Sequence, residues 1–110
     1  MKRLLSLSLF LMTAMLSFAH SFEVDGIYYN ITSSSAPYTV AVTYRGTSYN
    51  TFSNEYSGVV NIPETVTYNG NTYTITKISD YAFAECSNSL SVTIPNTVTT
   101  ISAHAFYHCI

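Results

Sequence analysis

Four side chains near the C-terminal end of the chain have the chemistry of metal ligands. His104 and His108 are spaced i and i+4, which would place both imidazoles on one face of a helix. Cys86 and Cys109 add two soft thiols. Because zinc binds histidine nitrogen and cysteine sulfur, these four residues form a candidate zinc site.

A second set, Ser79, Asp80 and His104, has the residue types of a hydrolytic triad. Such a set can be assembled from almost any serine-rich chain, so a supporting motif is needed. The sequence contains no nucleophile elbow, no zinc-protease motif and no phosphate-binding glycine loop. We therefore expect no enzymatic activity and no cofactor.

These reactive residues lie in an internal repeat, so one part of the chain can be compared with another. Residues 60–67, VNIPETVT, return as residues 92–99, VTIPNTVT, at an offset of 32. Residues 78–86, ISDYAFAEC, return as residues 101–109, ISAHAFYHC, at an offset of 23. The difference, 32 − 23 = 9, is an insertion in the first copy, which contains an Asn-Gly pair at 69–70. The repeat unit without this insertion has 23 residues, a length that predicts stacked turns sharing one core.

The comparison of the two copies argues against a metal site. The two histidines replace Tyr81 and Glu85 of the first copy, whereas both cysteines recur at one inward-facing position. Imidazoles and thiols should therefore point in different directions, and we expect no bound metal. The two cysteines are interpreted as stacked buried thiols, and a disulfide between them is the alternative in an exported protein.

Each repeat is predicted to contain a short strand followed by a helical or 3₁₀ return. Leu90, Val92 and Ile94 alternate as inward-facing strand residues, and Pro95 ends the strand because it cannot donate to a ladder. In the return, apolar residues recur at helix-like separations of 4, 1 and 3. The predicted repeat core consists of Ile62, Val66, Ile78, Ala82, Phe83, Cys86, Leu90, Val92, Ile94, Val98, Ile101, Ala105, Phe106 and Cys109.

The repeated motifs resemble those of the BspA-like leucine-rich-repeat surface proteins of Bacteroidetes-type bacteria. The matching residues are Ile-Pro-x-Thr-Val at 62–66 and 94–98, and Ile-Ser-x-x-Ala-Phe-x-x-Cys at 78–86 and 101–109. The segment at 22–29, FEVDGIYY, also resembles the lead-in of bacterial members. The resemblance implies a solenoid, export, adhesion to host matrix proteins or other cells, and no catalytic centre.

Two hairpins and one central strand are predicted outside the repeat motifs. An Asp-Gly pair favours a type I′ turn because both central residues need positive φ, and the pair at 25–26 places Phe22 opposite Tyr29. The Asn-Gly pair of the insertion likewise places Val66 opposite Tyr73. Residues from Tyr38 to Tyr44 alternate between bulky or apolar and hydroxyl-bearing or small side chains, which predicts one buried face and one hydroxyl-rich face.

The first nineteen residues have the pattern of a signal peptide. A short basic start precedes a thirteen-residue apolar stretch, and small residues at Ser17 and Ala19 suit cleavage after Ala19. Cleavage after Ser21 is the alternative. No cysteine lies near either position, so we expect no lipid anchor and no transmembrane segment after cleavage. The chain is thus expected to be secreted or at the cell surface, with the periplasm as another destination.

Three segments follow from these patterns: a signal-peptide helix at 1–19, a β-rich lead-in at 20–58 and two repeats at 59–110. We predict a mainly β protein in which a small N-terminal β-sheet leads into an incomplete leucine-rich-repeat solenoid. The second repeat ends at Ile110 with no capping unit. Because a solenoid needs capped ends, we expect a truncated or fragmentary member with a poorly supported last repeat.

The composition argues against one class of partner, whereas the duplicated unit and the export signal favour a protein partner. Charged residues make up 9% of the chain, and without residues 1–19 the formal charge is 2 − 6 = −4, which disfavours nucleic-acid binding. We predict recognition of protein, including host extracellular matrix or another cell surface, on the strand face of the solenoid. The alternative is a carbohydrate-binding β-module with exposed aromatic contacts, for which Tyr49 and Tyr56 are the candidate residues.

Overall fold

The computed structural model describes residues 20–46, 56–86 and 90–109, which form eight β-strands and no helix. The predicted signal peptide lies outside these residues. Within the described part of the chain, no helix is long and apolar enough to cross a membrane.

The N-terminal hairpin forms as the Asp-Gly pair predicts. Strand β1 (Phe22–Val24) pairs antiparallel with β2 (Ile27–Ser33), and Phe22 lies opposite Tyr29. The turn residues Asp25 and Gly26 have φ values of 52° and 82°, as a type I′ turn requires. Strand β2 then pairs antiparallel with β3 (Thr39–Thr43).

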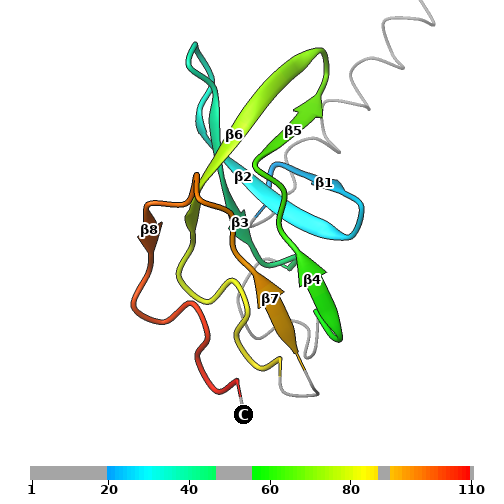
Figure 1. The fold of residues 1–110 in the computed structure, drawn as a ribbon, viewed down its shortest axis with the longest axis vertical. Coiled ribbons are helices and arrows are strands. Elements are labelled where there is room, and N and C mark those ends of the chain that lie inside the picture. Colours follow the sequence, from blue (N-terminus) through cyan, green and yellow to red (C-terminus); the bar gives the residue numbers. More distant parts are fainter. Residues whose placement is uncertain (1–19, 47–55, 87–89, 110) are drawn as a thin grey trace, which may run out of the picture.

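The second predicted hairpin also forms, within the first repeat. It joins β5 (Thr65–Tyr68) to β6 (Asn71–Ile78) through Asn69 and Gly70, whose φ values are 51° and 83°. Val66 lies opposite Tyr73, which confirms the predicted register. Because β6 also pairs in parallel with β3, the lead-in and the insertion share one sheet with the order β1-β2-β3-β6-β5 (Figure 1).

Strand β3 is buried on both faces, so the prediction of a single buried face is wrong. Ala41 is 1% exposed and Thr43 is 4% exposed. The reason lies outside the strand: Tyr28 pairs with Thr43 on this second face, and the Tyr56 ring packs against Tyr28 with a centroid separation of 5.7 Å. Tyr56 therefore covers the end of this second, hydroxyl-rich face.

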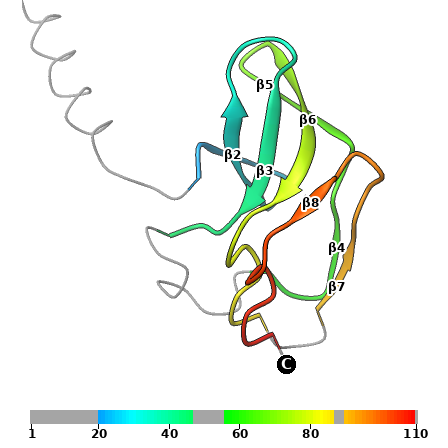
Figure 2. The ribbon, with the colours of Figure 1, turned by 90° about the vertical axis from the view of Figure 1, so that its left-hand side faces the viewer.

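The second repeat stacks on the first at the two sequence offsets. Strand β4 (Val59–Asn61) pairs in parallel with β7 (Ser91–Thr93), and Val60 lies beside Val92, 32 residues later. Strand β8 (Thr100–Ile101) pairs in parallel with the end of β6, and Ile78 lies beside Ile101, 23 residues later. Figures 1 and 2 both show β4 and β7 side by side below the larger sheet. The inserted hairpin accounts for the difference between the offsets.

The returns of both repeats are runs of turns, so the helical or 3₁₀ returns that the spacing predicted are wrong. Tyr81 and Glu85 have φ values of 63° and 61°, and His108 has 55°. This left-handed backbone is incompatible with a continuous right-handed helix. The residues at this spacing in the first copy, Ile78, Ala82, Phe83 and Cys86, are nevertheless buried, and successive tight turns bring them inward.

Backbone hydrogen bonds in the first return alternate between two kinds of partner. Ala82 and Ala84 donate within their own copy, to the carbonyls three residues earlier, at 3.1 Å. The intervening N–H groups donate to the next copy instead: those of Tyr81, Phe83 and Glu85 bond to the carbonyls of His104, Ala105 and Tyr107 at 3.0, 2.8 and 2.9 Å. The two returns are thus joined by a short ladder of backbone hydrogen bonds. In a helix these hydrogen bonds would lie within one copy.

Burial of the predicted repeat core decreases from the first copy to the second. The buried residues of this set are Ile62, Val66, Ile78, Ala82, Phe83, Cys86 and Ala105. Leu90, Val92, Ile94, Val98 and Cys109 are partly buried against them. Ile101 and Phe106 are 49% and 38% exposed, which corrects their assignment to the core. Among the described residues, no further layer covers their outer side.

We expect the two equivalent phenylalanines to differ in their contribution to stability. Phe83→Ala should lower the free energy of unfolding by about 3–5 kcal/mol because Phe83 is fully buried. Phe106→Ala should cost about 1 kcal/mol because that ring already contacts solvent. Denaturant unfolding of both variants measures the difference, and equal losses would contradict the unequal burial of the two copies.

Candidate binding surface

The most regular exposed surface is the outer side of the β4–β7 pair, which we call the strand face. Val60 and Val92 point into the core, so their neighbours Val59, Asn61, Ser91 and Thr93 point outward and are exposed. Val59 is an apolar side chain that is 71% exposed. Parallel pairing sets Val59 beside Ser91 and Asn61 beside Thr93, giving a short two-by-two array.

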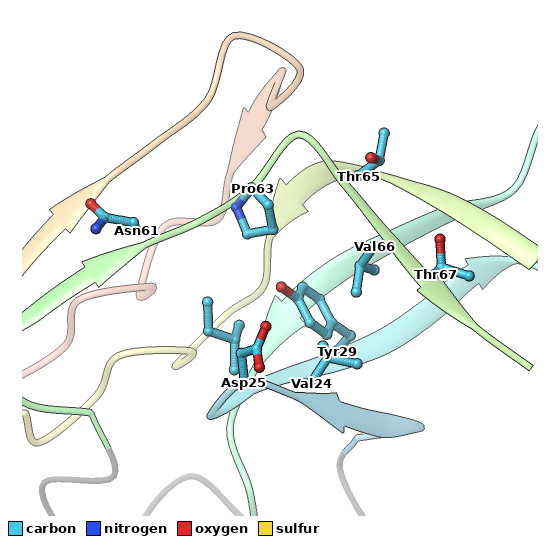
Figure 3. A pocket seen from close by; sticks show the side chains of 9 residues that line it. Val24, Asp25, Tyr29, Asn61, Pro63, Thr65, Val66 and Thr67 are labelled. Carbon is cyan, nitrogen blue, oxygen red and sulfur yellow. The ribbon is translucent and has the colours of Figure 1, made fainter.

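A pocket of about 340 Å³ opens beside this strand face. It lies between the β1–β2 turn and the segment from β4 to β5, and Figure 3 shows most of its lining side chains. The lining residues are Val24, Asp25, Ile27, Tyr29, Asn61, Pro63, Thr65, Val66 and Thr67. Asn61 belongs to both the pocket and the strand face, so the two surfaces are continuous.

The polar end of the pocket combines a carboxylate and a phenol. Both residues line the pocket, and Figure 3 shows the Tyr29 hydroxyl just below Pro63 and Asp25 further from Pro63, on the β1–β2 turn. Burial, together with the smaller effect of the negative charge of Asp25, raises the pKa of Tyr29 to about 12. Tyr29 therefore stays neutral at physiological pH and can donate a hydrogen bond into the pocket.

The four candidate zinc ligands lie in different environments. His104 and His108 are exposed, whereas Cys86 is 1% exposed, and the Cys109 thiol donates a hydrogen bond to the Cys86 carbonyl. Both cysteines are free thiols, and burial raises the pKa of Cys109. No three His, Cys, Asp or Glu side chains of the described segments gather in a way that could hold a metal ion.

The candidate triad is only partly assembled. Asp80 lies near His104, with 3.5 Å between Oδ1 and Nδ1, and its Oδ1 also accepts a hydrogen bond from the His104 N–H at 2.9 Å. No hydrogen bond between described residues joins Ser79 to this pair. The Asp80 carboxylate thus holds the second return against the first. A second contact between a carboxylate and an imidazole joins the two returns at Glu85 and His108, 3.0 Å apart.

Tyr56 is buried, which corrects its selection as an exposed contact residue. It is 4% exposed, and its hydroxyl donates to the Thr43 carbonyl at 2.7 Å and accepts from the Tyr28 N–H at 3.0 Å. Its ring also packs on Phe83, with 4.7 Å between centroids. Tyr49, the other candidate, lies outside the described residues.

Sequence reasoning missed Val59 and the pair of Asp25 and Tyr29. Val59 could have been found by comparing the copies, because an apolar residue in the first copy stands at the position of Ser91 in the second. The pocket gives no such signal. Its walls come from 24–29 and 61–67, two segments without a shared motif, and their proximity depends on the sheet.

The stacked parallel strands and turn ladders define a leucine-rich-repeat protein with a β-sheet lead-in. The comparisons identify the family. Residues 47–110, 64 of the 110 residues, match the family described as "BspA type Leucine rich repeat region (6 copies)". The chain therefore belongs to the BspA-type leucine-rich-repeat family, which confirms the resemblance stated from its motifs.

A solved structure supports the same assignment. A leucine-rich repeat protein from Bacteroides ovatus ATCC 8483 is 35% identical to this chain, with a TM-score of 0.63. The alignment covers 82% of this chain and 21% of that one, so the chain spans about a fifth of the length of that protein. Among curated proteins, none matches the chain.

We expect Tyr56→Phe to destabilise the protein by about 2 kcal/mol, because it leaves the Tyr28 N–H and the Thr43 carbonyl without their buried partner. Tyr68→Phe is a matched control, since Tyr68 is 36% exposed. It should change the free energy of unfolding by less than about 0.5 kcal/mol. Denaturant unfolding tests the pair, and similar losses in both variants would argue against a structural role for the Tyr56 hydroxyl.

Stability should fall above about pH 10 through Tyr29. The unfolded residue loses its proton near the ordinary tyrosine pKa of 10.0, whereas the folded residue holds it until about 12. Between these two pH values the unfolded state is therefore stabilised relative to the folded state. From about pH 8 to about pH 11, the wild type should lose about 1 kcal/mol more than Tyr29→Phe. Urea unfolding at both pH values measures this difference. An identical pH dependence of stability in the two proteins would show that the pKa of Tyr29 is not raised in the folded state.

Proposed function

We propose that this protein is an exported, non-enzymatic binding module that attaches to another protein through the strand face, in an adhesive role toward host matrix or cell surfaces. The observation that carries the proposal is the strand face itself. Stacked copies present their outward side chains in register, and one of them is a largely exposed valine.

The geometry of the strand face suits protein recognition. Stacked repeats create extended regular surfaces on which solenoid proteins bind their partners. Ser91 and Thr93 are short and uncharged, so a partner can approach the backbone closely without displacing long charged side chains. Val59 supplies apolar area at the end of the array, where burial by a partner would contribute to binding.

Export is supported by the sequence of residues 1–19, with its basic start, apolar stretch and small residues before the cleavage position. A surface or secreted location agrees with membership of the BspA-type family. In that location the strand face would meet extracellular proteins. No specific observation favours a catalytic or carbohydrate-binding role. Tyr56, a candidate contact residue for carbohydrate, is buried.

Binding to an array of immobilised extracellular matrix proteins tests the proposal. Val59→Asp places a charge on the strand face at a position that is already solvated, so the fold should be retained. We expect it to weaken binding at least about tenfold, equivalent to about 1.4 kcal/mol. Ser34→Asp makes the same type of change in the exposed β2–β3 loop and should leave binding unchanged. Equal binding by all three proteins, or no binding by the wild type, would contradict the proposal.

A further inference from the structure

The pocket beside the strand face contains one charged group. Asp25 is exposed at the tip of the β1–β2 hairpin, and no cationic side chain of the described segments forms an ion pair with it. The other polar groups are neutral: the Tyr29 hydroxyl, the Asn61 amide and the hydroxyls of Thr65 and Thr67. The pocket therefore has a negative end and offers several oxygen acceptors.

We propose that this pocket receives an arginine or lysine side chain of the bound protein, with the cationic head group at Asp25 and Tyr29. Charge complementarity carries the proposal, because a cation placed there pairs with an unpartnered carboxylate and with neutral oxygen atoms. Arginine is the better fit of the two, since its planar fork can bond the carboxylate and a hydroxyl together.

The walls of the pocket fit the remainder of such a side chain. Val24, Ile27, Pro63 and Val66 provide apolar surface around the polar end. Long cationic side chains pack their methylene stems on apolar surface and keep the charged group at a polar end. The volume of about 340 Å³ is near the lower limit of ligand pockets, roughly 300–1,000 Å³, which suits one side chain better than a large ligand.

The position of the pocket connects it to the strand face. Asn61 lies on the outer side of β4 and also lines the pocket, so a partner lying across β4 and β7 passes its opening. Arginine side chains in pockets are frequent energetic centres of protein interfaces. The inference rests on the proposed function only in taking the bound molecule to be a protein.

A neutral sugar fits these groups less well. Tyr29 is 1% exposed, so it offers its hydroxyl and no open ring face on which a sugar could stack. A sugar would also leave the charge of Asp25 uncompensated. Sugar binding is therefore treated as an outcome that would overturn the proposal.

Titration with short peptides tests the pocket without any protein partner. Two acetylated and amidated alanine pentapeptides are compared, one with a central arginine and one with a central citrulline, which has nearly the same shape but no charge. Binding is followed by nuclear magnetic resonance shifts of the Asp25 and Tyr29 signals. We expect the arginine peptide to bind at least about tenfold more tightly than the citrulline peptide.

Asp25→Asn is the decisive variant. Asparagine tolerates the φ of 52° at this turn position, so the hairpin is retained while the charge is lost. We expect it to reduce the affinity for the arginine peptide to that for the citrulline peptide. Asp80→Asn removes the same charge on the opposite part of the fold and keeps the acceptor for the His104 N–H, so it should leave peptide binding unchanged.

A second measurement separates binding in the pocket from a general charge effect. Guanidinium remains protonated above pH 12, so a bound arginine should lower the pKa of Tyr29 below about 12. Site-specific titration of carbon-13-labelled tyrosine measures this shift. Equal affinities for the two peptides, equal losses in both aspartate variants, an unchanged Tyr29 titration, or shifts produced by methyl glucoside and not by the arginine peptide would each overturn the proposal.

The two proposals fail in different experiments. If Val59→Asp weakens matrix-protein binding while the two peptides bind alike, the strand face is supported and the pocket assignment is overturned. If the arginine peptide binds as expected and the wild type binds no matrix protein, the pocket assignment is supported and the proposed adhesive function is overturned.

Discussion

The structure depends on backbone N–H groups that have no partner inside their own repeat. In the first return, every second N–H donates to the next copy, and the strand segments pair with the next copy as well. Because a buried N–H without a partner is costly, a repeat is stable only when another layer lies against it. This requirement fixes the register, and the register then places equivalent side chains in contact.

The lead-in meets the same requirement on the other side of the first repeat. The Ser79 N–H donates to the Val42 carbonyl, just as the equivalent Ser102 N–H donates to the Ile78 carbonyl. Strand β3 thus takes the place of a preceding repeat strand, although its sequence lacks the repeat motif. Tyr56 does the same for the return, because its ring packs on Phe83 as Phe106 does, at 4.7 Å and 5.2 Å.

The sequence predicted the features that depend on local chemistry or on the duplication. Both turns with positive φ and both stacking offsets are confirmed, since Asp-Gly and Asn-Gly pairs and repeated motifs are visible without a structure. The predictions that were wrong depended on contacts between distant segments. The helix-like spacing gave no sign that the backbone of one return forms hydrogen bonds with the return of the second copy. The burial of Thr43 and Tyr56 arises from their contact with each other. The pocket was missed because neither wall carries a motif.

Strand β6 belongs to both halves of the molecule. The strand pairs with β3 and β5 in the lead-in sheet. Its last residues, Lys77 and Ile78, also pair with β8 of the second repeat. In arrays of similar repeats, units can separate one at a time because each contacts only its neighbours. Here the loss of β6 removes the pairing partner of β3, β5 and β8 together. The nine-residue insertion, which lengthens this strand, therefore couples the lead-in sheet to the second repeat.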